Sequence, residues 1–91
     1  VLYPQSFTLY QNYPNPFNPT TTISYDIADG GHVELSVYNM NGQLIETLVN
    51  THMSPGYYST IWNGDKGSSG LYICRLSFGN QTITQKMLLM K

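Results

Sequence analysis

The fold class predicted by this sequence is all-β: a seven-stranded antiparallel immunoglobulin-like β-sandwich. Three observations predict it. Apolar and polar side chains alternate along every long segment, β-branched and aromatic residues fill those segments, and turns rich in glycine, proline or asparagine separate them. Ninety-one residues suit one domain with a modest core, so residues 1–91 are expected to form a single sandwich.

Composition and charge exclude several classes of protein. Charged residues make up 10% of the chain and the net charge is −1, so no basic field is available to hold nucleic acid. A hydrophobic content of 41% is too high for a disordered chain. The longest apolar runs span only a few residues, which predicts no transmembrane segment. Val1 is not an initiator methionine and no signal peptide follows. Residues 1–5 are therefore interpreted as a linker remnant in a fragment from downstream in a longer protein.

A short first strand over residues 6–10 leads into a stiff segment, Gln11–Pro19, which we call the proline segment. It contains three of the five prolines. Proline fixes φ and cannot donate to a ladder, so the segment is expected to be extended or turning and not a central strand. Its Tyr13 and Phe17 are predicted to cap one end of the core. The alternative is that a partner also reads this surface.

The next predicted strand covers residues 20–27, and its core face carries Ile23, Tyr25 and Ile27. A turn at Asp29-Gly30-Gly31 separates it from the central hairpin. That hairpin joins residues 32–38 to residues 43–49, and the core face of its first strand carries Val33, Leu35 and Val37.

Two turn geometries compete in the central hairpin. A two-residue loop at Asn41-Gly42 would set Glu46 opposite buried Val37. A three-residue loop closed by Gly42 in the left-handed conformation would set Ile45 there instead. Burying an unpaired carboxylate is costly, so the three-residue loop is favoured. Its register further sets Thr47 opposite Leu35 and Val49 opposite Val33.

The second half of the chain continues as strands and glycine-rich turns. Residues 50–55 are expected to be a loop, followed by a strand whose Tyr58, Thr60 and Trp62 share one face, with Trp62 in or at the edge of the core. A turn over residues 63–70 precedes a strand over residues 71–78.

A two-residue turn at Gly79-Asn80 is predicted to form the last hairpin, with Phe78 opposite Gln81. The final strand, Gln81 to Met90, then places Ile83 beside Leu76 and Met87 beside Tyr72. As an edge strand it could accept a partner strand by β-augmentation, while its lysines discourage self-pairing.

Few residues suggest chemistry, and no catalytic residue or cofactor is predicted. The single cysteine, Cys74, is expected to be a buried hydrophobe and not a nucleophile. Glu34 and Glu46 are interpreted as polar-face carboxylates. Asn63 and Asp65, with the carbonyls of their loop, are weak calcium candidates and otherwise ordinary turn residues. Exposed tyrosines could instead stack sugar rings, and the candidates are Tyr3, Tyr10, Tyr38 and Tyr57.

Motifs spread over the chain carry a family resemblance. They are Gln11-Asn-Tyr-Pro-Asn-Pro-Phe-Asn-Pro19, Val37-Tyr-Asn-x-x-Gly-Gln43, Gly56-Tyr57, Trp62-Asn-Gly64, Ser69-Gly-Leu-Tyr72 and Thr84-x-Lys86-Met-Leu-Leu-x-Lys91. Together they resemble the C-terminal sorting domain of the type IX secretion system, from about residue 6 to residue 91. The loop between Trp62 and Gly70 is shorter than is common in that family, which puts a loop-borne ligand in doubt. The fold also resembles the immunoglobulin-like domain of flagellar hook-capping proteins.

The resemblance implies a sorting signal with no catalysis of its own. Its partners would be an N-terminal cargo domain in the parent chain, the type IX translocon and a sortase-like peptidase, and the cargo would reach the cell surface or the medium by way of the periplasm. The matching positions are Asn15, Pro16, Phe17, Asn18, Pro19, Gly56, Tyr57, Gly70, Tyr72, Lys86 and Lys91. An accessory sandwich that binds carbohydrate or acts as a spacer in a secreted enzyme is the alternative function.

Overall fold

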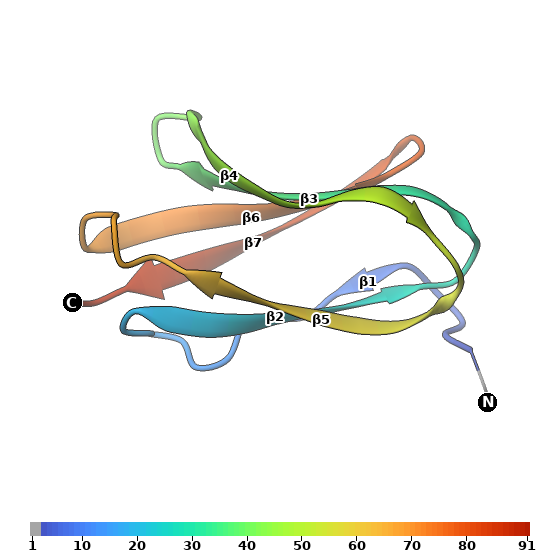
Figure 1. Ribbon diagram of the computed structural model, residues 1–91, viewed down its shortest axis with the longest axis horizontal. Helices are drawn as coiled ribbons and strands as arrows, with labels where there is room; N and C mark the ends of the chain where they lie inside the picture. Colours follow the sequence, from blue (N-terminus) through green and yellow to red (C-terminus); the bar gives the residue numbers. More distant parts are fainter. Residues whose placement is uncertain (1–2) are drawn as a thin grey trace.

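The computed structural model describes residues 3–91, which form two antiparallel sheets packed face to face (Figure 1). The strands in this part of the chain are β1 (Thr8–Leu9), β2 (Thr20–Ile27), β3 (Gly31–Asn39), β4 (Leu44–Met53), β5 (Gly56–Asn63), β6 (Gly70–Phe78) and β7 (Gln81–Leu89). One sheet has the order β1-β2-β5 and the other β4-β3-β6-β7. The predicted seven-stranded all-β sandwich is confirmed. None of the described residues forms a helix able to cross a lipid bilayer.

The core lies between the sheets and is made by alternate residues of the long strands. Its buried members include Ile23, Tyr25 and Ile27 from β2, Val33, Leu35 and Val37 from β3, Tyr72, Cys74 and Leu76 from β6, and Met87 and Leu89 from β7. Trp62 of β5 is also buried and packs edge-on against Tyr72, with ring centroids 5.2 Å apart. The predicted core faces are therefore confirmed, including the placement of Trp62.

The last hairpin has the predicted turn and register. Gly79 adopts a φ of 58°, which glycine tolerates without strain, and Phe78 lies opposite Gln81. Farther along the same ladder Tyr72 lies opposite Met87. This register places Met87 and Leu89 in the core and Ile83 against it, and leaves the even-numbered residues of β7, including Leu88, on the outer face.

The central hairpin has the predicted turn but a different register. Gly42 is left-handed, with a φ of 83°, as the three-residue loop requires. Glu46 nevertheless lies opposite Val37, where Ile45 was expected, because bulges interrupt the pairing of β3 with β4. Glu46 is exposed and accepts a hydrogen bond from Trp62 Nε1 at 3.2 Å. The burial cost that argued against this pairing therefore does not arise.

The bulges also change the pairing partners of Ser36 and Leu35. Thr47 pairs with Ser36 instead of Leu35, and Val49 pairs with Leu35. The prediction of a loop over residues 50–55 is also wrong, because β4 continues to Met53. Polar residues there suggested a loop, but β4 is an edge strand whose side chains are largely exposed, so polar side chains are tolerated.

Candidate functional site: the joined ends of the chain

The proline segment lies along the β1-β2-β5 sheet and reaches the C-terminal strand. Tyr13 forms an antiparallel bridge with Thr22. Phe17 is buried in the core, where its ring centroid is 5.6 Å from that of Trp62. Tyr13 is 80% exposed, so the prediction that it caps the core is wrong. Its partner Thr22 is one of the β2 residues that alternate with the core residues, which directs Tyr13 to the outer face of the sheet.

A small polar cluster shapes the proline segment from inside. Asn12 is 3% exposed and its Nδ2 donates to the carbonyl of Pro14 and to Thr21 Oγ1. Thr21 Oγ1 in turn donates to the Pro14 carbonyl at 2.9 Å. Prolines have no N–H to donate, so this segment offers few backbone donors. The side chains of Asn12 and Thr21 supply the donors for the Pro14 carbonyl.

The backbone of Phe17 pairs directly with β7. Its N–H donates to the Leu88 carbonyl and its carbonyl accepts from the Met90 N–H, both at 3.0 Å. This is a parallel bridge centred on Leu89. Phe17 therefore places its side chain in the core between the two sheets, and its backbone pairs with β7 at the edge of the β4-β3-β6-β7 sheet.

Two side chains of the proline segment extend this contact along β7. Asn15 Oδ1 accepts from the Leu88 N–H at 2.9 Å. Gln11 Nε2 donates to the Lys86 carbonyl, also at 2.9 Å. From the Lys86 carbonyl to the Met90 N–H, these contacts occupy four outward-facing backbone groups of the edge strand.

The last residue is held by the glycine-rich loop before β6. Lys91 Nζ donates to the carbonyls of Asp65 and Gly67, at 2.5 and 2.9 Å. The backbone N–H of Lys91 donates to Ser69 Oγ at 2.9 Å. The loop thus binds both the ammonium group and the backbone N–H of Lys91.

The loop has the shape needed for this contact because its own bonds bend it. The Asp65 N–H donates to Asn63 Oδ1, and the hydroxyl of Tyr72 donates to the Ser68 carbonyl. A Cβ at Gly67 would lie 2.6 Å from the Tyr72 hydroxyl, so the loop can pass this ring only as glycine. Gly70 has a φ of 148° and begins β6.

The calcium hypothesis for Asn63 and Asp65 is not favoured by this arrangement. Within residues 3–91 no group of three or more histidine, cysteine, aspartate or glutamate side chains is placed to hold a metal ion. Two of the loop carbonyls that a calcium ion would need already accept hydrogen bonds from the Lys91 ammonium.

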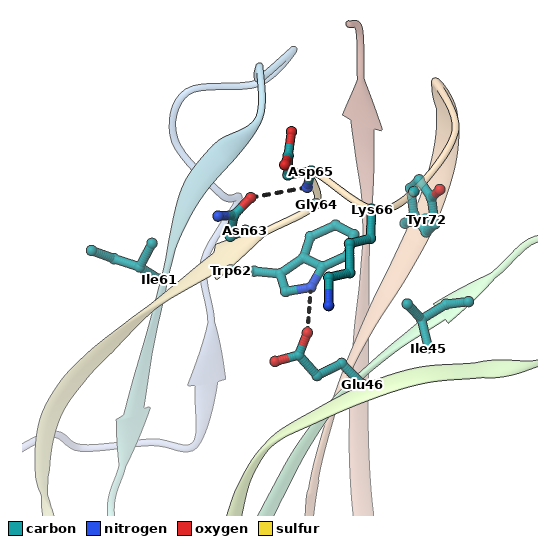
Figure 2. A pocket seen from close by; sticks show the side chains of 10 residues that line it. Ile45, Glu46, Ile61, Trp62, Asn63, Gly64, Asp65, Lys66 and Tyr72 are labelled. Carbon is teal, nitrogen blue, oxygen red and sulfur yellow. Dashed lines mark hydrogen bonds between the residues drawn. The ribbon is translucent and has the colours of Figure 1, made fainter.

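A groove of about 500 Å³ opens beside the same loop, between β4 and β5. Its lining includes Trp62 and Tyr72 together with Ile45, Glu46 and Lys66 (Figure 2). The Trp62–Glu46 hydrogen bond ties the two sheets together across this groove. The indole donor of a buried tryptophan is thereby satisfied.

Most residues of the family motifs converge at this end of the sandwich. Asn15, Phe17 and Lys91 make the contacts described above. Pro19 accepts a hydrogen bond from the Gly64 N–H at 2.8 Å, while Pro16, Asn18 and the side chain of Lys86 are exposed. Gly56 and Tyr57 lie elsewhere, opposite Ile27 and Asp26 at the far end of β2.

Among the participants that were not predicted from the sequence are Gln11 and Ser69. The side chain of each forms a hydrogen bond with a residue more than twenty positions away, and no local pattern indicates such a bond. The only signal was indirect, since Gln11 belongs to the first motif and Ser69 to a later one.

Cys74, the single cysteine, lies in the hydrophobic core. It is buried in β6, and burial raises the pKa of its thiol to about 12. A thiol with this pKa is protonated at neutral pH, in keeping with its prediction as a buried hydrophobe.

Residues 3–91 thus form a β-sandwich without helices, in which the proline segment and the end of β7 are joined into one surface. A family model described as a secretion system C-terminal sorting domain matches residues 11–90. The chain belongs to this family, the sorting domains of type IX secretion, and the resemblance found in its motifs is confirmed. Such a signal directs export to the cell surface or the outside. Comparison with curated proteins and with solved structures gives no match, so the likeness to hook-capping proteins stays a prediction.

Proposed function

We propose that this domain is the C-terminal module of a larger secreted protein and takes an attached cargo through the outer membrane by way of the type IX translocon. The domain acts as a substrate and an address, without catalysis of its own. The cargo reaches the periplasm first, and a sortase-like peptidase then removes the domain and joins the cargo to the cell surface. The family match supports the sorting role.

One structural observation supports recognition at the joined ends. The two sequence motifs farthest apart, the proline segment and the C-terminal strand, meet through hydrogen bonds from Gln11, Asn15 and Phe17. Two distant motifs that fold into one surface can be read by a single receptor contact. The exposed side chains there include Pro16, Asn18 and Lys86.

The β7 edge offers the machinery a second contact, by strand addition. Alternation along β7 directs the backbone groups of Thr82 and Thr84 away from β6. In the described part of the chain no hydrogen bond reaches these groups. The β-augmentation expected for the whole strand is therefore restricted to residues 82–86, because the proline segment occupies the remainder.

The sorting role is tested by export of a reporter. Residues 1–91 are fused behind a reporter that bears its own signal peptide, in a host with the type IX system and in a matched strain that lacks it. We expect reporter on the surface or in the medium only in the first strain. Retention in the periplasm of both strains would contradict the proposal.

The edge contact is tested within the same reporter. A Thr84→Pro substitution removes an outward N–H that has no partner in the fold, so the domain should stay folded while a docking strand loses a donor. We expect reduced export. Ser77→Pro on β6 is unsuitable as a comparison because β6 is a central strand, so the matched control is Thr84→Ala, which keeps the N–H and should be exported normally. Equal export of both variants would refute the edge contact.

A further inference from the structure

The outer face of the β1-β2-β5 sheet carries a group of exposed tyrosines that the sorting role does not use as a group. Tyr10, Tyr13 and Tyr57 are 46%, 80% and 58% exposed. Tyr57 lies opposite Asp26, Tyr10 donates its backbone N–H to the Ser24 carbonyl, and Tyr13 pairs with Thr22. Because Thr22, Ser24 and Asp26 alternate with the core residues of β2, all three rings stand on the same outer face.

Asp26 lies at the centre of this face and is unusual for a carboxylate. It is 7% exposed, and the hydroxyl of Tyr10 donates to its Oδ2. That hydrogen bond to Asp26 is the main reason that the pKa of Tyr10 is raised. The ring of Tyr57 stands on the other side, on the neighbouring strand.

The second carboxylate oxygen of Asp26 is an open acceptor. No described residue donates to Oδ1. Every fully enclosed side-chain polar atom within residues 3–91 has a partner, so Oδ1 is not enclosed and must reach the surface. A nearly buried carboxylate thus presents one acceptor between two exposed aromatic rings.

The charge of the face restricts the chemistry of a ligand. No lysine or arginine occurs in β1, β2 or β5, and Asp26 is the one acidic residue of these strands. An anionic ligand would meet this carboxylate with no cation to offset it. The other outward side chains of β2 and β5 are mainly hydroxyls, including Thr22, Ser24 and Ser59.

We propose that this face binds a neutral polysaccharide, with Tyr10, Asp26 and Tyr57 forming the main subsite and Tyr13 an extension of it. The C–H faces of pyranose rings pack against tyrosine, and sugar hydroxyls donate to Asp26 Oδ1 and exchange hydrogen bonds with the serine and threonine hydroxyls. The surface is a sheet face and not a cavity, so it suits several units of a chain better than one monosaccharide. Affinity per domain is expected to be weak, on the order of 1 mM.

This binding goes beyond the sorting role and is tested without the secretion system. Residues 1–91 are run on native gels that contain barley β-glucan, xyloglucan or glucomannan, with polygalacturonate as an anionic comparison. We expect retardation by at least one neutral polysaccharide and none by polygalacturonate. Absence of retardation by all three neutral polymers, or retardation by polygalacturonate alone, would overturn the proposal.

Variants then locate the site. For Tyr57→Ala and for Asp26→Asn, the polysaccharide concentration that gives the same retardation should be at least about tenfold higher. Leu44→Ala is the matched control, since Leu44 is 55% exposed on β4 of the other sheet, and it should bind normally. Melting curves identify any variant that has lost its fold, and if Asp26→Asn unfolds, folded Tyr57→Ala decides the test alone. Undiminished binding by folded Tyr57→Ala would place the glycan elsewhere and refute this site.

Discussion

The two halves of β7 differ although they belong to one edge strand. From the Lys86 carbonyl to the Met90 N–H, outward backbone groups are bonded by the proline segment. Around Thr82 and Thr84, the corresponding groups have no partner in the described chain. One half is closed by residues more than seventy positions away in sequence, and the other is open.

This difference shows how the domain manages a strand edge. An exposed edge is a template for unwanted pairing, and full closure would remove it. Here closure covers the half that ends in the C-terminal lysine and stops at Lys86, whose charged side chain is exposed. Residues 86–90 are thereby held in place, while a short stretch of the edge around Thr82 and Thr84 stays open. The shortness of this stretch and the charge of Lys86 protect it from self-pairing.

The closed half should depend most strongly on Phe17. Phe17→Ala removes a buried ring that packs on Trp62 and should lower the free energy of unfolding by about 3–5 kcal/mol. Tyr13→Ala, in the same segment but 80% exposed, should change it by less than about 0.5 kcal/mol. Urea unfolding of the two variants checks this, and equal losses would contradict the division between a core ring and a surface ring.

Asn15→Ala should have an intermediate effect. It removes the acceptor of the Leu88 N–H and should cost about 1 kcal/mol. Hydrogen exchange of the Leu88 amide should become faster, while that of the Thr84 amide, already unpaired, should stay fast. Asn18→Ala, an exposed neighbour, is the matched control. Unchanged protection at Leu88 would show that Asn15 does not close the edge.

Lys91→Met should have a smaller effect on stability, below about 1 kcal/mol, because the ammonium group is exposed and screened by solvent. The substitution keeps much of the side-chain length and removes the donor to the Asp65 and Gly67 carbonyls. Amide chemical shifts of the loop residues should change, whereas Lys86→Met should leave the loop unchanged. Unchanged amide chemical shifts of the loop residues in Lys91→Met would show that Lys91 does not contact the loop.

Cys74 gives the smallest effect at neutral pH and reports on the middle of β7, since it lies opposite Gln85. A thiol reagent at pH 7 should not label the folded domain and should label it fully in urea. Burial raises the thiol pKa from an ordinary 9.0 to about 12, so the folded state holds the proton more tightly than the unfolded state. Its contribution to stability is complete below pH 9 and is lost as the pH rises toward 12. Rapid labelling at pH 7 would mean that the open half frays far enough to expose β6.

The strands were predictable where a strict alternation met a clear turn. Alternation fixed β2 at residues 20–27, and the two-residue turn at Gly79-Asn80 then fixed the pairing of Leu76 with Ile83. Both signals are local, and both reflect one face turned to a core. The placement of Trp62 followed from the same rule.

The register of β3 with β4 was not predictable by this reasoning. The bulges insert residues into β4, and an edge strand can absorb them because few of its side chains must face the core. Burial of Glu46 was the wrong criterion, since the carboxylate stays exposed and binds the indole of Trp62. The contacts of Gln11, Asn15 and Lys91 depend on tertiary approach, so their residue types alone could not indicate them.

The pairing of the proline segment with β7 has a consequence for synthesis. The bonds join residues 11–17 to residues 86–90, so the surface they create is absent until the last strand has been made. A chain that stops early, or one whose final strand is lost to a protease, has the first motif but cannot display the joined surface. A receptor that reads this surface would therefore bind only domains in which residues 86–90 are present and paired with the proline segment.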